Sequence, residues 1–226
     1  MKPEIYGPEH LLYVLITAAV FTLLLVLLKK YITSERQKAL LMRLMGVIGL
    51  LSVIWVRWCV AFMEQDGNLW YLIPDTICGT CSMFTALAFL SGKKDNNVLH
   101  AIWLIAIAGD IATMVYPDFI GDGATIFYAP TISGLWHHSW TLFCYVTART
   151  LGLFTPDAHK CTMNLFAGAY LVVMGWFLIK VAHLPDAFYW QKPAVEGTIL
   201  YLPLIVFLYL LVYIAIMLVI TRLQKK

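Results

Sequence analysis

The sequence predicts an all-α protein, a polytopic bundle of seven transmembrane helices that forms one domain over residues 1–226. Composition is the first reason: 61% of the residues are hydrophobic and 13% are charged, against roughly 25% charged in a soluble domain. The second reason is that long apolar runs recur, each able to cross a hydrocarbon core of about 30 Å as a helix. Because the backbone must satisfy its own hydrogen bonds in lipid, helices are the expected spanning form.

Seven apolar runs follow one another, separated by short polar joints. The joints carry the charged, Gly and Pro residues that mark turns, as in "EQDGN" and "SGKKDNN". The fourth run is the weakest because it contains Asp110. The predicted spans are residues 10–28, 41–63, 71–91, 98–116, 129–148, 161–183 and 198–221.

Charge divides the joints into two sets. Those after the first, third and fifth spans, with the C-terminus, hold 12 of the 16 basic residues, whereas the opposite set holds nine of the 13 acidic residues. If the fourth span were absent, Lys93 and Lys94 would lie on the same side of the membrane as the acidic residues. The charge pattern therefore supports the fourth span. The positive-inside rule then predicts the N-terminus outside and the C-terminus in the cytoplasm, with Tyr189 in an outer aromatic belt. This topology explains the net charge of +3, and no nucleic-acid partner is expected.

Ionisable side chains inside the spans mark the candidate site, because each costs about 2.5–3.5 kcal/mol on membrane-insertion scales. Arg57, Asp110, His137 and His138 qualify. At a rise of about 1.5 Å per residue, they lie about 9 to 12 Å below the outer ends of their spans, and Cys78 lies at about 10 Å. We expect a polar cavity that opens toward the outer leaflet.

Structural roles are the alternative for several of these residues. An Arg57–Asp110 pair would tie the second span to the fourth without any chemistry. Neighbouring helical residues lie about 100° apart, so one of His137 and His138 is expected to be a packing residue. Packing is also the expected role of four glycines and three cysteines: Gly46, Gly49, Gly168, Gly175, Cys59, Cys144 and Cys161.

Three chemistries compete for the cysteines of "IPDTICGTC". As a nucleophile for acyl transfer, Cys78 would lie in the second turn of a helix opened by Pro74 and Asp75, with a histidine of the fifth span as base. As a redox pair, Cys78 and Cys81 would need a second cysteine pair in an outer loop, and the outer joints contain no cysteine. The two cysteines and two histidines have poor spacing for a tetrahedral zinc site. We predict neither a metal nor a cofactor.

Two other classes of seven-helix protein do not fit. A retinal protein needs a Schiff-base lysine midway along the last span, and "TILYLPLIVFLYLLVYIAIMLVI" contains none. A transporter usually has paired interrupted helices, whereas here only Pro203 interrupts the last span.

Five motifs occur in order along nearly the whole chain. They are "GPEHLL" entering the first span, "IPDTIC" opening the third, Pro-Asp after the fourth, His138 in the fifth and "QKP" before the seventh. The series resembles the YwaF-like family of bacterial integral membrane proteins, which is distantly similar to eukaryotic transmembrane protein 164. The resemblance implies a seven-helix fold related to the androgen-induced-gene membrane hydrolases, a multi-pass place in the bacterial inner membrane, and acyl transfer between lipids.

Site residues can be carried over from this resemblance by position. It implies Cys78 as the nucleophile and His138, less surely His137, as the histidine of the catalytic pair. His10 matches the histidine that enters the first span. The sequence departs from the family at Thr76, where members often carry histidine.

Asp75 and Asp110 are further departures, because these positions are usually apolar in the family. We assign Asp75, Asp110, His10 and Arg57 to substrate binding, with Arg57 near the lipid headgroup. The predicted function is a lipid acyltransferase or acyl hydrolase, with membrane lipids as partners. The alternatives are a non-catalytic lipid- or partner-binding protein and, less favoured, a membrane thiol oxidoreductase.

Overall fold

The computed structural model describes residues 3–157, 160, 163–192, 199 and 201–224, and all regular structure in these ranges is helical. The all-α prediction is confirmed, with a helix for each predicted run. The packing role expected for Cys161 falls outside the described residues. The helices are α1 Pro8–Tyr31, α2 Glu35–Cys59, α3 Ile77–Leu90, α4 Asn97–Val115, α5 Ala129–Thr150, α6 Met163–Lys180 and α7 Leu202–Gln224.

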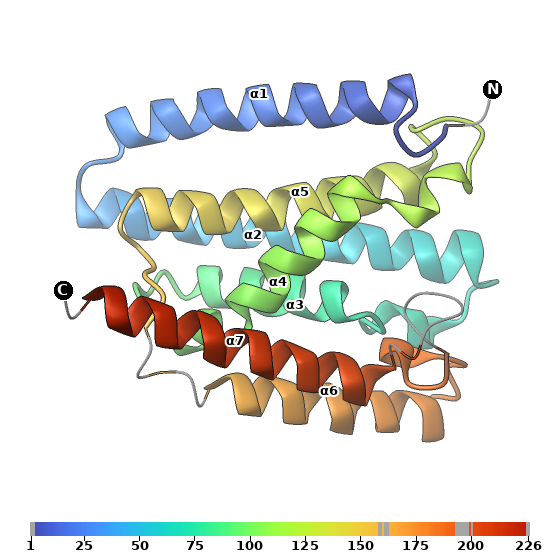
Figure 1. The fold of residues 1–226 in the computed structure, drawn as a ribbon. Coiled ribbons are helices and arrows are strands. Elements are labelled where there is room, and N and C mark those ends of the chain that lie inside the picture. The colour runs from blue at the N-terminus through green and yellow to red at the C-terminus, as the bar shows by residue number, and fades with distance from the viewer. Residues whose placement is uncertain (1–2, 158–159, 161–162, 193–198, 200, 225–226) are drawn as a thin grey trace.

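Consecutive helices run in opposite directions through one bundle (Figure 1). α1 forms one edge, α6 and α7 form the opposite edge, and α4 crosses the bundle obliquely. We call the end where α1 begins, α2 ends and α3 begins the acidic end, and the opposite end the basic end. The two sets of joints that differ in charge therefore lie at opposite ends of the bundle.

Local capping chemistry sets several helix starts. Ser34 and Gln37 form a capping box at the start of α2, in which each side chain accepts a hydrogen bond from the other's backbone N–H. Asn96 caps α4 through the Val98 N–H. Thr76 caps α3 by accepting the Gly79 N–H at 3.1 Å, so the residue that departs from the family pattern has a structural role here.

α3 is shorter than the predicted span 71–91. A separate 3₁₀ turn, η2 (Leu69–Leu72), precedes it, and the backbone is extended at Ile73. The physical reason is Pro74, which disfavours a helical conformation in the residue before it. Because the helix begins at Ile77, Cys78 lies in its first turn and not, as predicted, in its second.

Glycines allow the helices to approach closely. A Cβ at Gly46 of α2 would lie 2.5 Å from the backbone nitrogen of Leu90 in α3. A Cβ at Gly49, Gly168 or Gly175 would meet its nearest neighbour at 3.1 to 3.2 Å. The packing role predicted for these four glycines is confirmed.

Four helices are long and apolar enough to cross a membrane: α1, α2 with its π-helical extension η1 (Val60–Glu64), α4 with the following turn η3 (Asp118–Gly121), and α7. α3 and residues Phe166–Lys180 of α6 are apolar but shorter. α5 has sufficient length, but its histidines and hydroxyl residues lower its hydropathy. These lengths and compositions indicate a membrane protein.

Candidate functional site

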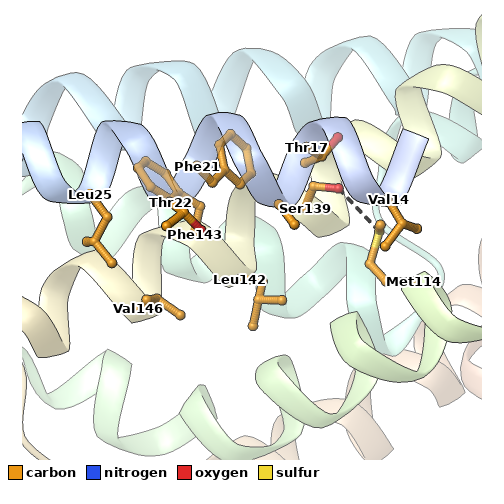
Figure 2. A pocket seen from close by; sticks show the side chains of 11 residues that line it. Val14, Thr17, Phe21, Thr22, Leu25, Met114, Ser139, Leu142, Phe143 and Val146 are labelled. Atoms are coloured by element: carbon orange, nitrogen blue, oxygen red, sulfur yellow. Dashed lines mark hydrogen bonds between the residues drawn. The ribbon is translucent and has the colours of Figure 1, made fainter. Parts of the chain in front are cut away.

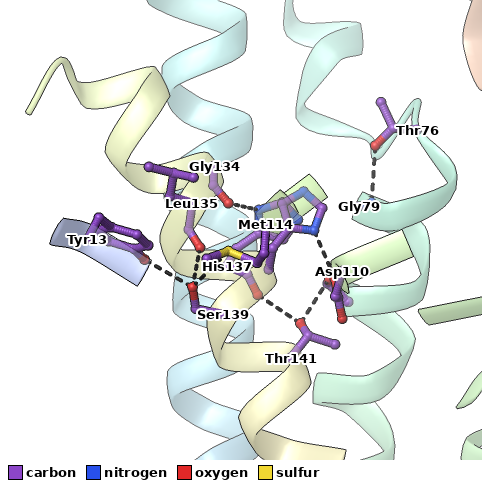
Figure 3. Close-up of polar contacts among 12 residues, drawn as sticks. Tyr13, Thr76, Gly79, Asp110, Met114, Gly134, Leu135, His137, Ser139 and Thr141 are labelled. Carbon is purple, nitrogen blue, oxygen red and sulfur yellow. Dashed lines mark hydrogen bonds and ion pairs between the residues drawn. The ribbon is translucent and has the colours of Figure 1, made fainter. Parts of the chain in front are cut away.

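A buried histidine–aspartate pair joins α5 to α4. His138 Nδ1 donates a hydrogen bond to Asp110 Oδ1 at 2.8 Å, and the two residues are 5% and 1% exposed. Figure 3 shows Asp110 directed toward the histidines of α5. When Asp110 is ionised, its carboxylate accepts the Nδ1 proton, and the free electron pair of His138 is then on Nε2. A general base in a catalytic triad has this arrangement.

His137 lies in the same polar cluster. Its ring centroid is 3.9 Å from that of His138, and its Nδ1 donates to the Gly134 carbonyl at 3.0 Å. Arg57 of α2 lies within electrostatic reach. Both adjacent histidines therefore reach the cluster, and His137 is not a satisfied packing residue, since its Nε2 has no hydrogen-bond partner among the described residues.

Three buried polar atoms of the cluster lack hydrogen-bond partners within the described part of the chain: His137 Nε2, Asp110 Oδ2 and Arg57 Nε. An unpaired buried polar atom costs about 1–3 kcal/mol. Such atoms are uncommon in native interiors, and an ion, a water or a ligand group often completes the set. The cluster therefore has unused capacity to bind a polar group.

Arg57 forms its ion pair with Asp75. The pair joins the last turn of α2 to the extended residues before α3. The predicted Arg57–Asp110 pair is wrong, because the reversal between α2 and α3 brings Asp75 to Arg57 while His138 holds Asp110. Arg57 is only 7% exposed, so the guanidinium lies within the bundle.

Cys78 faces α4 from the first turn of α3. A Cβ at Gly109 would lie 2.8 Å from the Cys78 sulfur, so glycine at this position makes room for the thiol. Thr113 and Asp110 of α4 lie near the thiol. Cys78 and His138 are thus both neighbours of Asp110, which brings the predicted nucleophile and base into one cluster.

Cys81 has different surroundings. It is 3% exposed and lines a cavity of about 310 Å³ between α3, α4 and α6, together with Phe84 and Tyr170. Both Cys78 and Cys81 are free thiols. Because the two cysteines have different surroundings, they fit one functional thiol and one packing residue better than a redox pair.

Residues 187–189, which follow α6, contact the cluster at Asp75. The Phe188 N–H donates to the Asp75 carbonyl at 2.8 Å, and Phe188 is 1% exposed. Phe188 and Tyr189 have φ angles of 58° and 61°. This left-handed backbone conformation costs a bulky residue about 1–3 kcal/mol and persists only where the surrounding contacts hold it, often at functional sites.

Tyr189 follows Phe188 in this strained stretch and is half-buried. Burial raises the pKa of the Tyr189 hydroxyl to about 12, and the charges of Cys78 and Asp75 contribute to the increase. The hydroxyl is therefore a neutral hydrogen-bond donor at physiological pH. The sequence assigns Tyr189 to an aromatic belt, and no motif distinguishes it from Trp190 beside it.

His10 binds main-chain groups. Its Nδ1 accepts the Tyr6 N–H at 3.1 Å, and its Nε2 donates to the Met114 carbonyl at 3.0 Å. His10 therefore ties the start of α1 to the end of α4. Both ring nitrogens are occupied, and neither is available to a substrate in this conformation.

Polar contacts continue from the cluster along the α3–α5 interface (Figure 3). The Thr141 hydroxyl donates to Ser82 Oγ at 3.0 Å, and the Thr85 and Tyr145 hydroxyls lie 3.0 Å apart. Sequence reasoning missed these residues. The available signal was the four-residue spacing of His137, Thr141 and Tyr145, which places them on one helix face.

Two apolar grooves lie along α1. The first, of about 320 Å³, is bounded by α1, α4 and α5 and includes Ser139 and Met114 (Figure 2). The second, of about 440 Å³, shares Thr17 and Phe21 with the first and is also lined by Ile126 and Phe127 before α5. Both grooves have a volume and a mostly apolar lining suited to hydrocarbon chains.

Among the described residues, no group of three or more His, Cys, Asp or Glu side chains is arranged to hold a metal ion. Comparisons with protein-family models, with curated protein sequences and with solved structures find no match for this chain. Its function must therefore be inferred from its own residues.

Proposed function

We propose that this chain is a membrane acyltransferase or acyl hydrolase that acts on lipids, with Cys78 as nucleophile and His138 as base. The observation that carries the proposal is the buried 2.8 Å hydrogen bond from His138 Nδ1 to Asp110 Oδ1. This bond makes Nε2 the basic atom, in a cluster that also holds the Cys78 thiol. Asp110 is then a positioning residue for His138, and not the substrate-binding residue that the sequence suggests.

The reaction has two steps in this proposal. His138 Nε2 takes the Cys78 thiol proton as the sulfur attacks the carbonyl carbon of a lipid ester, and a C–S bond forms. The tetrahedral intermediate collapses, the ester C–O bond breaks, and His138 returns the proton to the departing alcohol oxygen. A second lipid alcohol, or water in a hydrolase, then attacks the thioester carbon while His138 Nε2 takes its proton; the C–S bond breaks, and His138 returns the proton to the Cys78 sulfur.

Arg57 is the residue best suited to bind a substrate group. Its guanidinium pairs with Asp75 through one nitrogen, while the buried Nε has no hydrogen-bond partner among the described residues. A lipid phosphate or ester oxygen is the kind of acceptor that a guanidinium binds well.

The proposed protein crosses the bacterial inner membrane seven times, with its N-terminus outside and its C-terminus in the cytoplasm. The alternating helix directions and the charge difference between the two ends support this topology. It places the cluster in the outer half of the bilayer. Membership of the YwaF-like family is part of the proposal and is supported by the ordered motif series alone.

A non-catalytic lipid-binding protein is the second candidate. The two grooves along α1 favour it, because an acyl chain could occupy either one without reaching Cys78. In that case the histidine–aspartate pair would stabilise the fold by linking α4 to α5.

Intact-mass measurement in phospholipid nanodiscs, with and without hydroxylamine, tests the proposal. We expect a hydroxylamine-labile acyl adduct on the wild-type protein and on Cys81→Ser, and none on Cys78→Ser. An adduct that survives in Cys78→Ser would move the chemistry to another residue. No adduct on any variant would favour the lipid-binding candidate, and a Cys78–Cys81 disulfide would favour a thiol oxidoreductase.

A further inference from the structure

The cavity between α3, α4 and α6 begins one helical turn from the candidate nucleophile. On α3 its wall includes Cys81, which follows Cys78 by three residues. Residues three apart on a helix are neighbours on its surface, and these two are separated by about 4.5 Å along the helix axis. The α3 wall of the cavity therefore continues to Cys78.

The α4 wall leads to the same thiol. A Cβ at Gly109 would lie 2.8 Å from the Cys78 sulfur, so the thiol packs against α4 at this position. Ile105, Ile102 and Val98 line the cavity, and their spacing from Gly109 is that of one helix face. At a rise of about 1.5 Å per residue, this lining extends from about 6 to about 16 Å beyond the level of the thiol. One face of α4 thus runs from the thiol along the whole cavity.

The size and the lining of this cavity suit a hydrocarbon chain. Its volume is about 310 Å³, and its walls are apolar apart from the hydroxyl and thiol groups of Thr80, Cys81 and Tyr170. Phe84 and Tyr170 meet edge to face across it, with ring centroids 5.0 Å apart. The distance from the thiol level to its far end is close to half of a hydrocarbon core of about 30 Å, which is the depth that one lipid chain covers.

The direction of the cavity also fits. It extends from the thiol toward the basic end, because α4 begins there and Val98 lies in its first turn. In the proposed topology, the chains of outer-leaflet lipids point the same way. The two grooves along α1 differ, since none of their lining residues belongs to α3, the helix that carries Cys78.

We propose that the cavity between α3, α4 and α6 holds the acyl chain of the thioester on Cys78 and limits the chain length that the protein accepts. The inference rests on the proposed function. The C–S bond forms and the ester C–O bond breaks at the thiol, as in that reaction, and the cavity binds only the hydrocarbon part of the acyl group.

Ala101→Phe tests the inference, because Ala101 lines the cavity about 12 Å from the level of Gly109. The protein is placed in nanodiscs of equal amounts of dilauroyl and dioleoyl phosphatidylglycerol, and intact mass resolves the two acyl adducts. We expect the ratio of oleoyl to lauroyl adduct to fall at least about tenfold, as when a hydrophobic pocket rejects a longer chain. The lauroyl adduct reports that the variant is folded. Ala19→Phe, at an exposed position of α1, is the matched control and should keep the wild-type ratio.

Ala18→Phe fills the groove between α1, α4 and α5 and should also keep the wild-type ratio. A fall in Ala18→Phe with none in Ala101→Phe would place the chain in that groove and overturn the inference, as would an unchanged ratio in Ala101→Phe. If Ala101→Phe forms no adduct, Ala101→Leu decides: a smaller fall in the ratio is expected, and an unchanged ratio overturns the inference. Absence of any adduct on the wild type would instead remove the proposed function itself.

Discussion

α1 and α5 are neighbours with opposite characters. α1 is strongly apolar and qualifies at once as a membrane span, yet within Pro8–Tyr31 only His10 is buried. α5 does not qualify on hydropathy, yet 15 of its 22 residues are buried, and they include both histidines of the candidate site. Phe21 of α1 stacks on Phe143 of α5 with ring centroids 4.4 Å apart, so the two helices touch while their surroundings differ.

The difference shows how a membrane protein distributes its residues. A helix that faces lipid must be apolar over most of its surface, and hydropathy detects it easily. A helix inside the bundle can carry polar side chains, because neighbouring helices supply their hydrogen-bond partners. The helix that hydropathy ranks low is therefore the one around which the site is built.

Asp110→Asn disturbs the site built around α5, and we expect it to give the largest effect, a slower rate of acyl-adduct formation. The amide removes the carboxylate that selects the Nδ1 proton of His138, so we expect acyl-adduct formation to slow by about 1,000- to 10,000-fold, as when the aspartate of a catalytic triad is replaced. The measurement is the time course of intact mass in nanodiscs. Asp66→Asn, at an exposed acid in the α2–α3 joint, is the control. An unchanged rate in Asp110→Asn would show that orientation of His138 plays no part in the reaction.

Replacing one leucine by alanine on each of the two helices should give the next largest effect, on the free energy of unfolding. Leu135 of α5 is fully buried, whereas Leu15 of α1 is 67% exposed. We expect Leu135→Ala to lower the free energy of unfolding by about 3 kcal/mol through lost packing and a cavity, and Leu15→Ala to change it by less than about 0.5 kcal/mol. Denaturant unfolding in detergent, followed by tryptophan fluorescence, measures both. Equal losses would mean that α1 is packed more tightly than its exposure indicates.

Replacing one threonine by valine on each of the two helices should give the smallest effect on stability. Thr141→Val on α5 removes the hydrogen bond to Ser82 Oγ, and we expect a loss of about 1 kcal/mol, within the range measured for interhelical bonds in membrane proteins. Thr22→Val on the exposed face of α1 makes the same change in shape and should leave stability within error. The measurement is the difference between the thermal unfolding temperatures of the two variants. If both are neutral, the α3–α5 hydroxyl contacts do not contribute to stability.

Local features of the sequence predicted some elements well and others poorly. Apolar runs located every helix, because the hydrophobic length of a span is a local property. The start of α3 was misplaced, since Pro74 ends the run of helical backbone although the surrounding residues stay apolar. Depth along each span placed Arg57 and Asp110 at one level but paired them incorrectly, because depth carries no information about which faces meet.

The same limit applies to the candidate site. Residue type and depth selected Cys78 and His138 as candidates, and the structure brings both of them next to Asp110. Their shared neighbour Asp110 could not be placed, since its contact with His138 depends on the packing of α4 against α5.

The sequence by itself determined that the chain is all-helical, where its helices lie and which ends carry which charge. These properties depend on the length, polarity and order of segments, and each can be evaluated from a stretch of about 20 residues. Only the tertiary structure decided that Arg57 pairs with Asp75, that His138 pairs with Asp110 and that the Phe188 N–H binds the Asp75 carbonyl. Those contacts join residues from different segments, and the rotation of each helix about its own axis, together with the path of each joint, decides which side chains meet.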